Sequence, residues 1–286
     1  MILVTGATGN IGRELVRQLS VGGVDGADGY GTPVRALTRD AARAGAALPD
    51  GVEVAEGDLE RAESLNSALD GVRSLFLISG VGDDARVLDA ARDAGVEHVV
   101  LVSSITVVTH PHLGPARTNL AVERRLRESG MEWTVLRPTQ FASNTLWWAR
   151  SVRDESVVRV PYADVGLPTV HPADIASVAR AALTGPGHRG RTYPLTGPKR
   201  ISPRRQAGEL GRVLGREVAC VGVTRADAYP PMAAMMGGEV ADSVLDLMGG
   251  DVNDALLAVH DTVARVTGSP ARSYRRWAEE NADAFR

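Results

Sequence analysis

Short apolar runs alternate with segments of helical periodicity through the first half of the chain. The runs lie at residues 2–4, 33–37, 52–55, 74–79, 98–104 and 133–137. Each is mostly apolar at consecutive positions, which is typical of strands covered on both faces of a sheet. Between them, apolar residues recur every three or four positions, as on one face of a helix. Six such units in series predict a parallel, doubly wound α/β sheet.

The junction between the first apolar run and the first helical segment carries glycines at positions 6, 9 and 12. In a strand–turn–helix context, Gly6 permits a tight turn, Gly9 lets a pyrophosphate approach the backbone, and Gly12 lets the helix pack closely. The free N–H groups and the positive end of the helix dipole favour phosphate. A glycine-rich loop without a ligand is the alternative. We predict a Rossmann-type dinucleotide site whose first turn contributes Gly6, Thr8, Gly9, Asn10 and Ile11.

The second half of the chain loses the regular alternation. Strands are expected at residues 157–160, 192–195 and 217–223, and helices at residues 173–183, 203–214 and 273–284. We expect a nucleotide-binding domain at residues 1–155 and a smaller, mostly helical substrate-binding lobe at residues 156–286. The lobe is expected to be interleaved with the first domain and to cover the carboxyl edge of the sheet. Residues 22–32 have turn composition and predict a surface insertion.

The end of the second predicted strand distinguishes NAD from NADP. An acid there binds the ribose 2′-hydroxyl of NAD, whereas an arginine accommodates the 2′-phosphate of NADP. Thr38 and Arg39 stand at this position, and a guanidinium fork suits phosphate. Asp40 is the nearby acid, and a helix cap is its more typical role. We predict NADPH as the cofactor. Arg35 is a further candidate for binding it, although an arginine within a strand is more often structural. For Arg39 the alternative is a solvated position on the surface.

Small or polar residues follow the other predicted strands. Ligands of open parallel sheets bind outside the carboxyl ends of the strands, so these positions are expected to meet the cofactor. Asp58 can accept a hydrogen bond from the adenine amino group or cap the next helix, and both alternatives stay open. The further cofactor-binding positions are expected at Asp58, Leu59, Ser79, Gly80, Ser103, Pro138, Thr139 and Phe141.

Four motifs carry a resemblance to a known family. They are Thr5-Gly-Ala-Thr-Gly-Asn-Ile-Gly12, Gly57-Asp58, Leu136-Arg137-Pro138 and Val170-His-Pro-Ala-Asp-Ile-Ala176. Together they resemble the atypical short-chain dehydrogenases of the NmrA-like group, and the resemblance covers almost the whole chain. It implies an NADPH-dependent reductase of quinones, dyes or ketones. Other members of the group bind the nucleotide only as sensors.

The usual catalytic pair of the superfamily, Tyr-x-x-x-Lys, is absent. The tyrosines stand at positions 30, 162, 193, 229 and 274, and none has a lysine four residues later, since the chain's one lysine is Lys199. This argues against epimerase or dehydratase chemistry, which relies on the tyrosine as a base. Hydride transfer needs only a cofactor, a well-placed carbonyl and a proton from solvent, a weak acid or the substrate.

Candidates for the catalytic step follow the fifth predicted strand. The hydroxyl of Ser103 or Ser104 can donate to a developing alkoxide, with turn capping as the alternative for Ser104. His110 can supply a proton near neutral pH, although an exposed loop residue is the more frequent case. Asn119 occupies roughly the position where the reductases that this chain resembles carry a polar residue. We expect the catalytic candidates to be Ser104, His110 and Asn119, with a substrate-assisted proton transfer as the other route.

Tryptophan and methionine residues suggest a flat apolar substrate pocket. The expected lining residues are Trp147, Trp148, Tyr229, Met232 and Met236, with ordinary core packing as the alternative for the tryptophans. The sequence therefore predicts reduction of a ketone or quinone carbonyl on a polycyclic aromatic compound, such as a polyketide in antibiotic biosynthesis. The alternatives are an NADP(H)-binding redox sensor without catalysis and a quinone or dye reductase of broad specificity.

The bulk composition narrows the partners and the compartment. The chain has 286 residues, 44% of them hydrophobic, and a formal net charge of −3. This charge argues against nucleic acid as the main partner, and no apolar run approaches the ~20 residues that span a bilayer. The single cysteine, Cys220, excludes an internal disulfide and fits a reducing compartment. We expect a cytoplasmic protein with no signal peptide and no bound metal, and the sequence leaves monomer and homodimer open.

Overall fold

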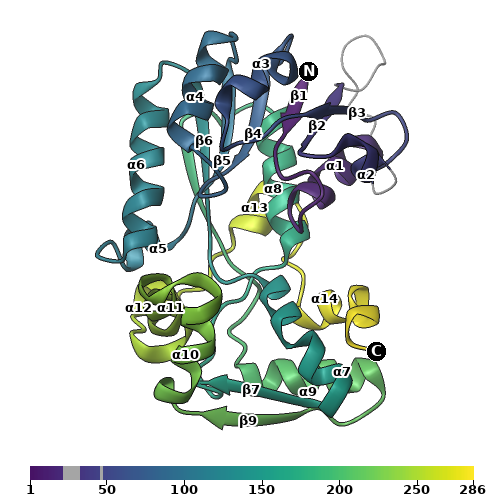
Figure 1. The fold of residues 1–286 in the computed structure, drawn as a ribbon, viewed down its shortest axis with the longest axis vertical. Coiled ribbons are helices and arrows are strands. Elements are labelled where there is room, and N and C mark those ends of the chain that lie inside the picture. The colour runs from purple at the N-terminus through teal and green to yellow at the C-terminus, as the bar shows by residue number, and fades with distance from the viewer. Residues whose placement is uncertain (22–32, 46–47) are drawn as a thin grey trace.

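The chain forms an upper part built on a parallel sheet and a lower, mostly helical lobe (Figure 1). The structure is a computed structural model that describes residues 1–21, 33–45 and 48–286, so the insertion expected at residues 22–32 lies outside the described residues. The N-terminus begins the sheet, and the C-terminus ends in the lower lobe. None of the described helices is long and apolar enough to cross a lipid bilayer.

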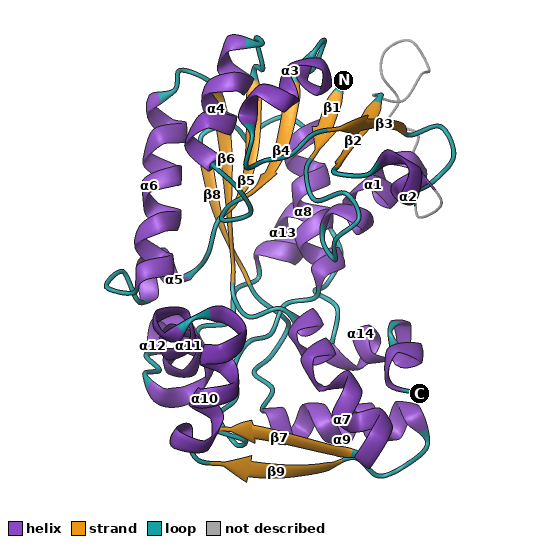
Figure 2. Ribbon diagram, in the orientation of Figure 1, coloured by secondary structure: helices purple, strands orange, loops and turns teal. Residues whose placement is uncertain are grey.

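The upper part contains a seven-stranded sheet with the order β3-β2-β1-β4-β5-β6-β8, and every neighbouring pair is parallel. Figure 2 shows these strands between helices on both sides. The order reverses between β1 and β4, which is the switch point where doubly wound sheets bind ligands. The predicted fold class is confirmed. The strands are β1 (Ile2–Val4), β2 (Val34–Thr38), β3 (Glu53–Glu56), β4 (Ser74–Ile78), β5 (His98–Val102), β6 (Glu132–Pro138) and β8 (Arg191–Leu195).

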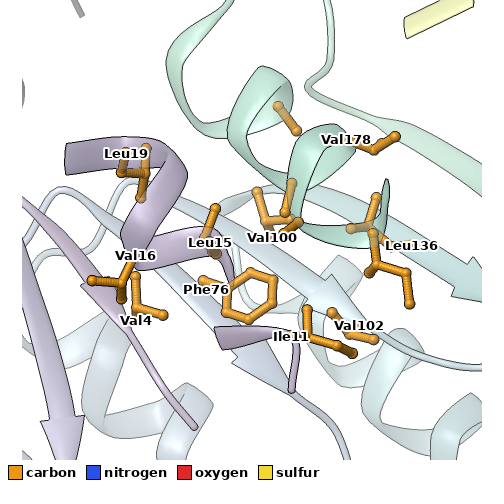
Figure 3. Packing of buried hydrophobic residues seen from close by; sticks show 14 of the residues in the cluster. Val4, Ile11, Leu15, Val16, Leu19, Phe76, Val100, Val102, Leu136 and Val178 are labelled. Atoms are coloured by element: carbon orange, nitrogen blue, oxygen red, sulfur yellow. The ribbon is translucent and has the colours of Figure 1, made fainter. Parts of the chain in front are cut away.

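Two hydrophobic layers cover the sheet, one on each face. Alternate strand residues such as Val4, Phe76 and Val100 pack with Leu15 of α1 and Val178 of α8 (Figure 3). Their neighbours along the strands belong to a second cluster on the opposite face. Because side chains alternate across a strand, a run that is apolar at every position is buried on both faces. The apolar runs of the sequence are therefore explained by these two layers.

Helices and short turns supply the outer layers of the upper part. On the first face lie α1, α8 and α13, and on the second face lie the 3-10 turn η1, α3, α4 and α6. The ring of His171 caps α8 by accepting a hydrogen bond from the amide of Ala173 at 3.0 Å. The bounds are α1 (Gly12–Val21), α2 (Ala41–Gly45), η1 (Ala62–Leu65), α3 (Asn66–Leu69), α4 (Asp84–Asp93), α5 (Thr106–Thr109), α6 (Gly114–Glu128), α8 (Pro172–Thr184) and α13 (Thr262–Thr267).

The lower lobe packs helices around a two-stranded parallel sheet of β7 and β9. Its own core includes Val158, Leu210, Trp277 and Phe285, all buried. The elements are η2 (Ala142–Trp148), α7 (Ala149–Glu155), β7 (Val157–Pro161), α9 (Pro203–Leu214), β9 (Ala219–Val223), α10 (Arg225–Met236), α11 (Gly238–Leu245), η3 (Asp246–Gly250), α12 (Asp254–Leu257), α14 (Tyr274–Glu280) and η4 (Ala282–Phe285).

The chain passes between the two parts more than once. Although they follow residue 156, α8, β8 and α13 belong to the layers of the upper sheet. Conversely, η2 and α7 precede that residue and pack with the lower lobe. The division into residues 1–155 and 156–286 remains a proposal. The elements that lie across this boundary from the part they pack with are η2, α7, α8, β8 and α13.

Candidate nucleotide and substrate site

A cavity of about 590 Å³ lies at the carboxyl ends of β1, β2 and β3. The glycine turn after β1 forms one wall, and the ends of β2 and β3 form the others. Seven of the residues predicted to bind the cofactor line this cavity, namely Gly6, Thr8, Gly9, Thr38, Arg39, Asp58 and Leu59. The remaining lining residues are Leu37, Asp40, Ala44, Gly57, Glu60 and Val81. The cavity lies at the edge of the sheet where doubly wound folds bind nucleotides.

The glycine turn is built to bring backbone N–H groups to a ligand. Gly6 has a φ of +58°, and the amide of Gly9 donates to its carbonyl at 2.8 Å. A Cβ atom on Gly12 would lie 2.6 Å from the carbonyl carbon of Gly6, so only glycine fits there. The side chain of Ile11 is in the core and that of Asn10 is exposed, so these two predicted residues offer their backbone.

The first turn of α1 supplies phosphate donors. Within the part of the chain that the structure describes, the amides of Asn10, Ile11 and Gly12 donate to no protein acceptor. Unpaired amides at a helix N-terminus form a ready site for a phosphate group. The residues present therefore fit the pyrophosphate of a dinucleotide.

Arg39 lies exposed at the rim of this cavity. It forms no ion pair with another described residue, so its guanidinium is available to a phosphate. The neighbouring hydroxyl of Thr38 accepts a hydrogen bond from the amide of Asp40 at 3.2 Å, and Glu56 accepts one from the amide of Ala41 at 2.9 Å. This local geometry is compatible with recognition of a 2′-phosphate, which remains a prediction.

Asp58 lines the cavity and also supports its own turn. One carboxylate oxygen accepts from the amide of Glu60 at 3.1 Å, and the other lies 3.3 Å from Nε of Arg61. Its backbone amide donates to the hydroxyl of Ser64 at 2.9 Å. The carboxylate therefore closes a turn ahead of η1 and does not cap it, since Arg61 is the N-cap residue of η1 and no side chain caps that element. The side chain also borders the nucleotide cavity.

Arg35 lies away from this cavity, which corrects the cofactor role predicted for it. Its side chain is buried and bonded to the ends of neighbouring elements. Nε donates to the carboxylate of Glu53 at 2.7 Å, and Nη1 donates to the carbonyls of Ala68 at 2.7 Å and Asp70 at 2.8 Å. A guanidinium with these acceptors ties β2 to β3 and α3 and has a structural role.

Ser79 and Gly80 also lie outside the lining of both cavities, and the predicted contact with the cofactor is not seen in this geometry. The carboxylate of Asp84 accepts from the hydroxyl of Ser79 at 2.9 Å and from the amide of Gly80 at 2.7 Å. Burial raises the pKa of Asp84, while these two hydrogen bonds lower it in part. The turn after β4 is thus fixed by an acid in α4, a role for this pair that the sequence did not reveal.

A second cavity, of about 210 Å³, lies at the carboxyl ends of β5 and β6. Five residues predicted for the cofactor, catalysis or the substrate line it, namely Ser104, Pro138, Thr139, Phe141 and Trp147. The sequence reasoning missed the other lining residues, which are Ile105, Thr106, Gln140, Asn144, Leu167, Val244, Leu247, Met248 and Leu256. Among the described residues, none with a titratable side chain lines this cavity, so it is neutral.

Three hydroxyl-bearing residues line the neutral cavity, namely Ser104, Thr106 and Thr139. Oγ of Ser104 accepts hydrogen bonds from the amide of Thr106 at 3.2 Å and from its hydroxyl at 2.8 Å. Because the amide and the hydroxyl of Thr106 both donate to Ser104, the hydroxyl hydrogen of Ser104 is available for a carbonyl oxygen. Oγ1 of Thr139 is buried and has no partner in the described part of the chain. A buried unpaired hydroxyl is costly, which suggests that a bound molecule completes its hydrogen bonding.

The three other predicted polar residues lie outside both cavities. Ser103 is buried and donates to Glu123 at 2.7 Å, so its predicted contact with the cofactor is corrected. His110 is 0% exposed, against the alternative of an exposed loop position, and it does not line the neutral cavity. Asn119 is half-buried in α6 and lines neither cavity. Of the three catalytic candidates, the structure brings only Ser104 to the cavity.

The apolar wall differs from the expected one. Trp147 lines the cavity and is 54% exposed, whereas Trp148 packs against the core of the lower lobe. Tyr229, Met232 and Met236 belong to α10 and do not line the cavity, which corrects their predicted role. The wall is formed instead by α11, η3 and α12. The only sequence signal for it was an ordinary amphipathic spacing of Val244, Leu247 and Met248, which a core helix would share.

The comparisons with known proteins agree with this geometry. A family model described as NAD(P)H-binding matches residues 6–186. The chain belongs to this NAD(P)H-binding family. The matched region starts at the first glycine of the turn and ends just beyond α8, so it contains the cavity at β1 to β3 and the strand ends of β5 and β6.

Relatives are similar over the full length of the chain. The chain is 40% identical over 290 residues to the (4-alkanoyl-5-oxo-2,5-dihydrofuran-3-yl)methyl phosphate reductase of Streptomyces griseus, covering 100% of this chain and 99% of the relative. It is 36% identical over 291 residues to the NAD(P)H azoreductase of Xenophilus azovorans, with the same coverage. A solved structure of the NADPH-dependent quinone oxidoreductase of Escherichia coli, complexed with NADPH, matches with a TM-score of 0.79 and 27% identity, covering 98% of this chain and 99% of that one.

The family match and the full-length relatives identify the protein as an NAD(P)H-dependent oxidoreductase. They also confirm the predicted membership of an NAD(P)H-binding reductase group. The glycine turn fits an NADP cofactor, and the neutral cavity lies at the same carboxyl edge of the sheet.

Proposed function

We propose that the protein reduces the carbonyl of a small quinone or aromatic ketone at the expense of NADPH. The observation that carries the proposal is the neutral cavity at the ends of β5 and β6, with a free serine hydrogen on its wall. It lies at the same sheet edge as the glycine turn. NADPH supplies a hydride when bound.

Ser104 is proposed to donate a hydrogen bond to the substrate carbonyl and so to stabilise the charge that develops on its oxygen. Thr139 offers a second hydroxyl on the same wall. Leu247, Met248 and Leu256 exclude water from the opposite side. Because no titratable side chain of the described residues lines the cavity, the proton is proposed to come from water or from a hydroxyl of the substrate.

The size of the cavity favours a smaller substrate than the polycyclic one that the sequence suggested. Pockets for drug-sized ligands measure about 300–1,000 Å³, and this cavity measures about 210 Å³. We therefore favour compounds of one or two rings. A polycyclic ketone, such as a polyketide in antibiotic biosynthesis, would have to displace part of the apolar wall.

The neutral lining also bears on charged substrates. The name of the Streptomyces griseus relative describes a methyl phosphate substrate. No arginine, lysine or histidine among the described residues lines the cavity here, so a phosphate would find no cationic partner in it. Uncharged substrates are accordingly proposed for this chain.

A broad specificity is a second candidate, and the uncharged lining favours it. Hydroxyl or carboxamide groups come from Ser104, Thr106, Thr139, Gln140 and Asn144, and the other lining side chains are mainly apolar. Without a charged group, shape and apolar contact take a large share in selecting the ligand. The azoreductase and quinone oxidoreductase among the relatives point in the same direction. A sensor without catalysis gains no support from the two full-length relatives, since both are named as reductases.

The test is NADPH oxidation with a graded panel of acceptors. The panel contains a benzoquinone, a naphthoquinone, a bicyclic aromatic ketone, a tetracyclic ketone and a phosphorylated analogue of one small acceptor. We expect the highest kcat/KM for the neutral one- and two-ring compounds. A tetracyclic or phosphorylated compound as the best acceptor would contradict the proposed substrate class, and no oxidation with any acceptor would contradict the activity.

A further inference from the structure

Part of the apolar wall of the substrate cavity belongs to a segment of the lower lobe that contacts the upper part at α5. This segment, residues 246–257, consists of η3, a short loop and α12, and it is called the lid segment below. It contributes Leu247, Met248 and Leu256 to the cavity. In Figure 1, α12 lies just below α5, and the two elements are in contact.

His110, at the end of α5, bonds to the backbone of the lid segment. Its Nε2 lies 2.7 Å from the carbonyl oxygen of Asp251, and its Nδ1 lies 2.9 Å from the hydroxyl of Thr109. A carbonyl only accepts, so Nε2 carries the hydrogen and the threonine hydroxyl donates to Nδ1. Both ring nitrogens of this buried imidazole are therefore used, and neither faces the substrate cavity.

Asn253 makes the second bond between the same two elements. Its Nδ2 donates to the carbonyl of Thr109 at 2.9 Å. Its Oδ1 accepts from the amide of Leu256 at 2.9 Å and so caps α12. One side chain thus holds the end of α5 and fixes the turn that places Leu256 in the cavity wall.

The helix α5 links this contact to the reacting side of the cavity. It follows directly on Ser104 and Ile105, which line the cavity, and the amide of His110 donates to the carbonyl of Thr106 at 2.9 Å. One helical turn therefore separates the serine hydroxyl from the bonds to the lid segment. The position of the apolar wall is set relative to Ser104 through this turn.

The beginning of the lid segment is held separately by the lower lobe. The carboxylate of Asp246 pairs with Arg225 at 2.7 Å. Gly249 lies against the ring of Tyr162, and a Cβ atom at this glycine would lie 2.6 Å from Cγ of the tyrosine. The bonds of His110 and Asn253 are thus the polar contacts that tie the far end of the segment to α5.

We propose that His110 and Asn253 form a latch that positions the lid segment over the substrate cavity. Both are positioning residues, since they act on the substrate through Leu256 and its neighbours. The role replaces the proton-donor role that the sequence suggested for His110. The inference rests on the proposed function only for its kinetic consequence, because the latch itself is a property of the fold.

Two variants remove hydrogen bonds of the latch while they keep either the cap of α12 or a buried ring at position 110. Asn253→Asp keeps an oxygen that caps α12 but replaces the donor to Thr109 by a second acceptor. His110→Phe keeps a buried ring and removes both hydrogen bonds. His112→Ala is the matched control, because His112 is 63% exposed and its ring makes no hydrogen bond to the lid segment. Its ring lies 3.9 Å from the carboxylate of Asp251 and 5.9 Å, centroid to centroid, from the ring of His110, so the control removes the neighbouring imidazole and keeps the bonds of His110 and Asn253.

The first measurement is amide hydrogen exchange of the full-length protein with NADPH bound. With Asn253→Asp we expect exchange in residues 246–257 to become about tenfold faster, as loss of about one hydrogen bond allows. Exchange in α4 and α8 should stay unchanged, and His112→Ala should behave as the unmodified protein. Unchanged exchange in residues 246–257 overturns the latch, whether or not the protein reduces any quinone.

The second measurement is steady-state reduction of a naphthoquinone. We expect both latch variants to raise KM for the quinone about tenfold, with the dissociation constant of NADPH within twofold and kcat less affected. A loss of kcat with an unchanged KM and a changed pH profile in His110→Phe would make His110 a proton donor and overturn the positioning role. If His110→Phe does not fold, Asn253→Asp decides both measurements.

Discussion

The hydroxyl of Ser103 donates to the buried carboxylate of Glu123 at 2.7 Å, while the next hydroxyl along the chain, that of Ser104, borders the substrate cavity. Glu123 also accepts from Arg137 at 2.6 Å. Burial alone would raise the pKa of Glu123, but the hydrogen bonds from Arg137 and Ser103 prevail and lower it. The two neighbouring serines therefore lie in different surroundings: Ser103 holds the end of β5 to α6, and Ser104 lines the neutral cavity.

This difference predicts opposite results for two similar substitutions. Ser103→Ala should lower the free energy of unfolding by about 1.5–3 kcal/mol, because a buried charged acceptor loses a donor. Ser104→Ala should leave the stability within about 1 kcal/mol and lower kcat by less than about a hundredfold, since Thr139 and water remain as donors. Denaturant unfolding and steady-state kinetics of both variants provide the check. Abolished turnover in a folded Ser104→Ala variant that still binds NADPH would make this serine indispensable.

Arg39 is predicted to select NADPH over NADH. Its guanidinium lies at the rim of the nucleotide cavity and has no carboxylate partner among the described residues. Arg39→Ala should weaken NADPH binding by about 1.5–3 kcal/mol, the usual value of a charge-assisted phosphate contact. NADH affinity, measured by the same calorimetric titration, is the internal control and should hardly change. Equal affinities of the unmodified protein for the two cofactors would place the selection elsewhere.

Substitutions of Gly9 and Gly12 are predicted to affect different properties, NADPH binding for Gly9 and stability for Gly12. A Cβ atom on Gly9 would lie 3.2 Å from the carbonyl oxygen of Gly6, a tight but tolerable contact, so Gly9→Val should fold and lose NADPH binding. A Cβ atom on Gly12 would lie 2.6 Å from backbone of the same turn, so Gly12→Ala should lower the melting temperature itself. Thermal unfolding with and without NADPH separates the two effects. Unchanged NADPH affinity in folded Gly9→Val would show that the phosphates bind elsewhere.

Because the ring of His98 is buried, we predict that the folded protein loses stability in acid. Its ring is buried at the start of β5 and lies 3.0 Å from the hydroxyl of Thr134, and burial lowers its pKa from the ordinary 6.5 to about 4. Between these values the unfolded chain binds the proton and the folded protein does not, so stability decreases as the pH falls. The total contribution is about 3 kcal/mol. His98→Gln should remove this part of the pH dependence in urea unfolding between pH 7 and 4, and an unaltered slope would refute the assignment.

The sequence was sufficient for the sheet and the glycine turn because their signals are local. The residues from 2 to 4 and from 98 to 102 are apolar at nearly every position, and the structure explains this by two hydrophobic layers. The spacing of Gly6, Gly9 and Gly12 likewise follows from close backbone contacts within one turn. Features that depend on neighbours in sequence were therefore predictable.

The substrate wall was not predictable because it depends on contacts between distant segments. Met236 and Met248 are chemically identical, yet only Met248 lines the cavity, since α10 lies away from it and η3 lies over it. Arg35 and Arg39 differ by four positions in one strand and its turn. Their separate roles follow from acceptors at Glu53, Ala68 and Asp70, which no local pattern reveals.

The central claim is that NADPH transfers a hydride to an acceptor held in the cavity at β5 and β6. The most direct test is a single-turnover oxidation of protein-bound NADPH by a small naphthoquinone, repeated with NADPH deuterated at the transferring position. We predict rapid oxidation with a primary isotope effect, and loss of oxidation without loss of NADPH binding when Leu256→Trp fills the cavity. Tight NADPH binding without oxidation by any acceptor, or full activity of Leu256→Trp, would contradict the account.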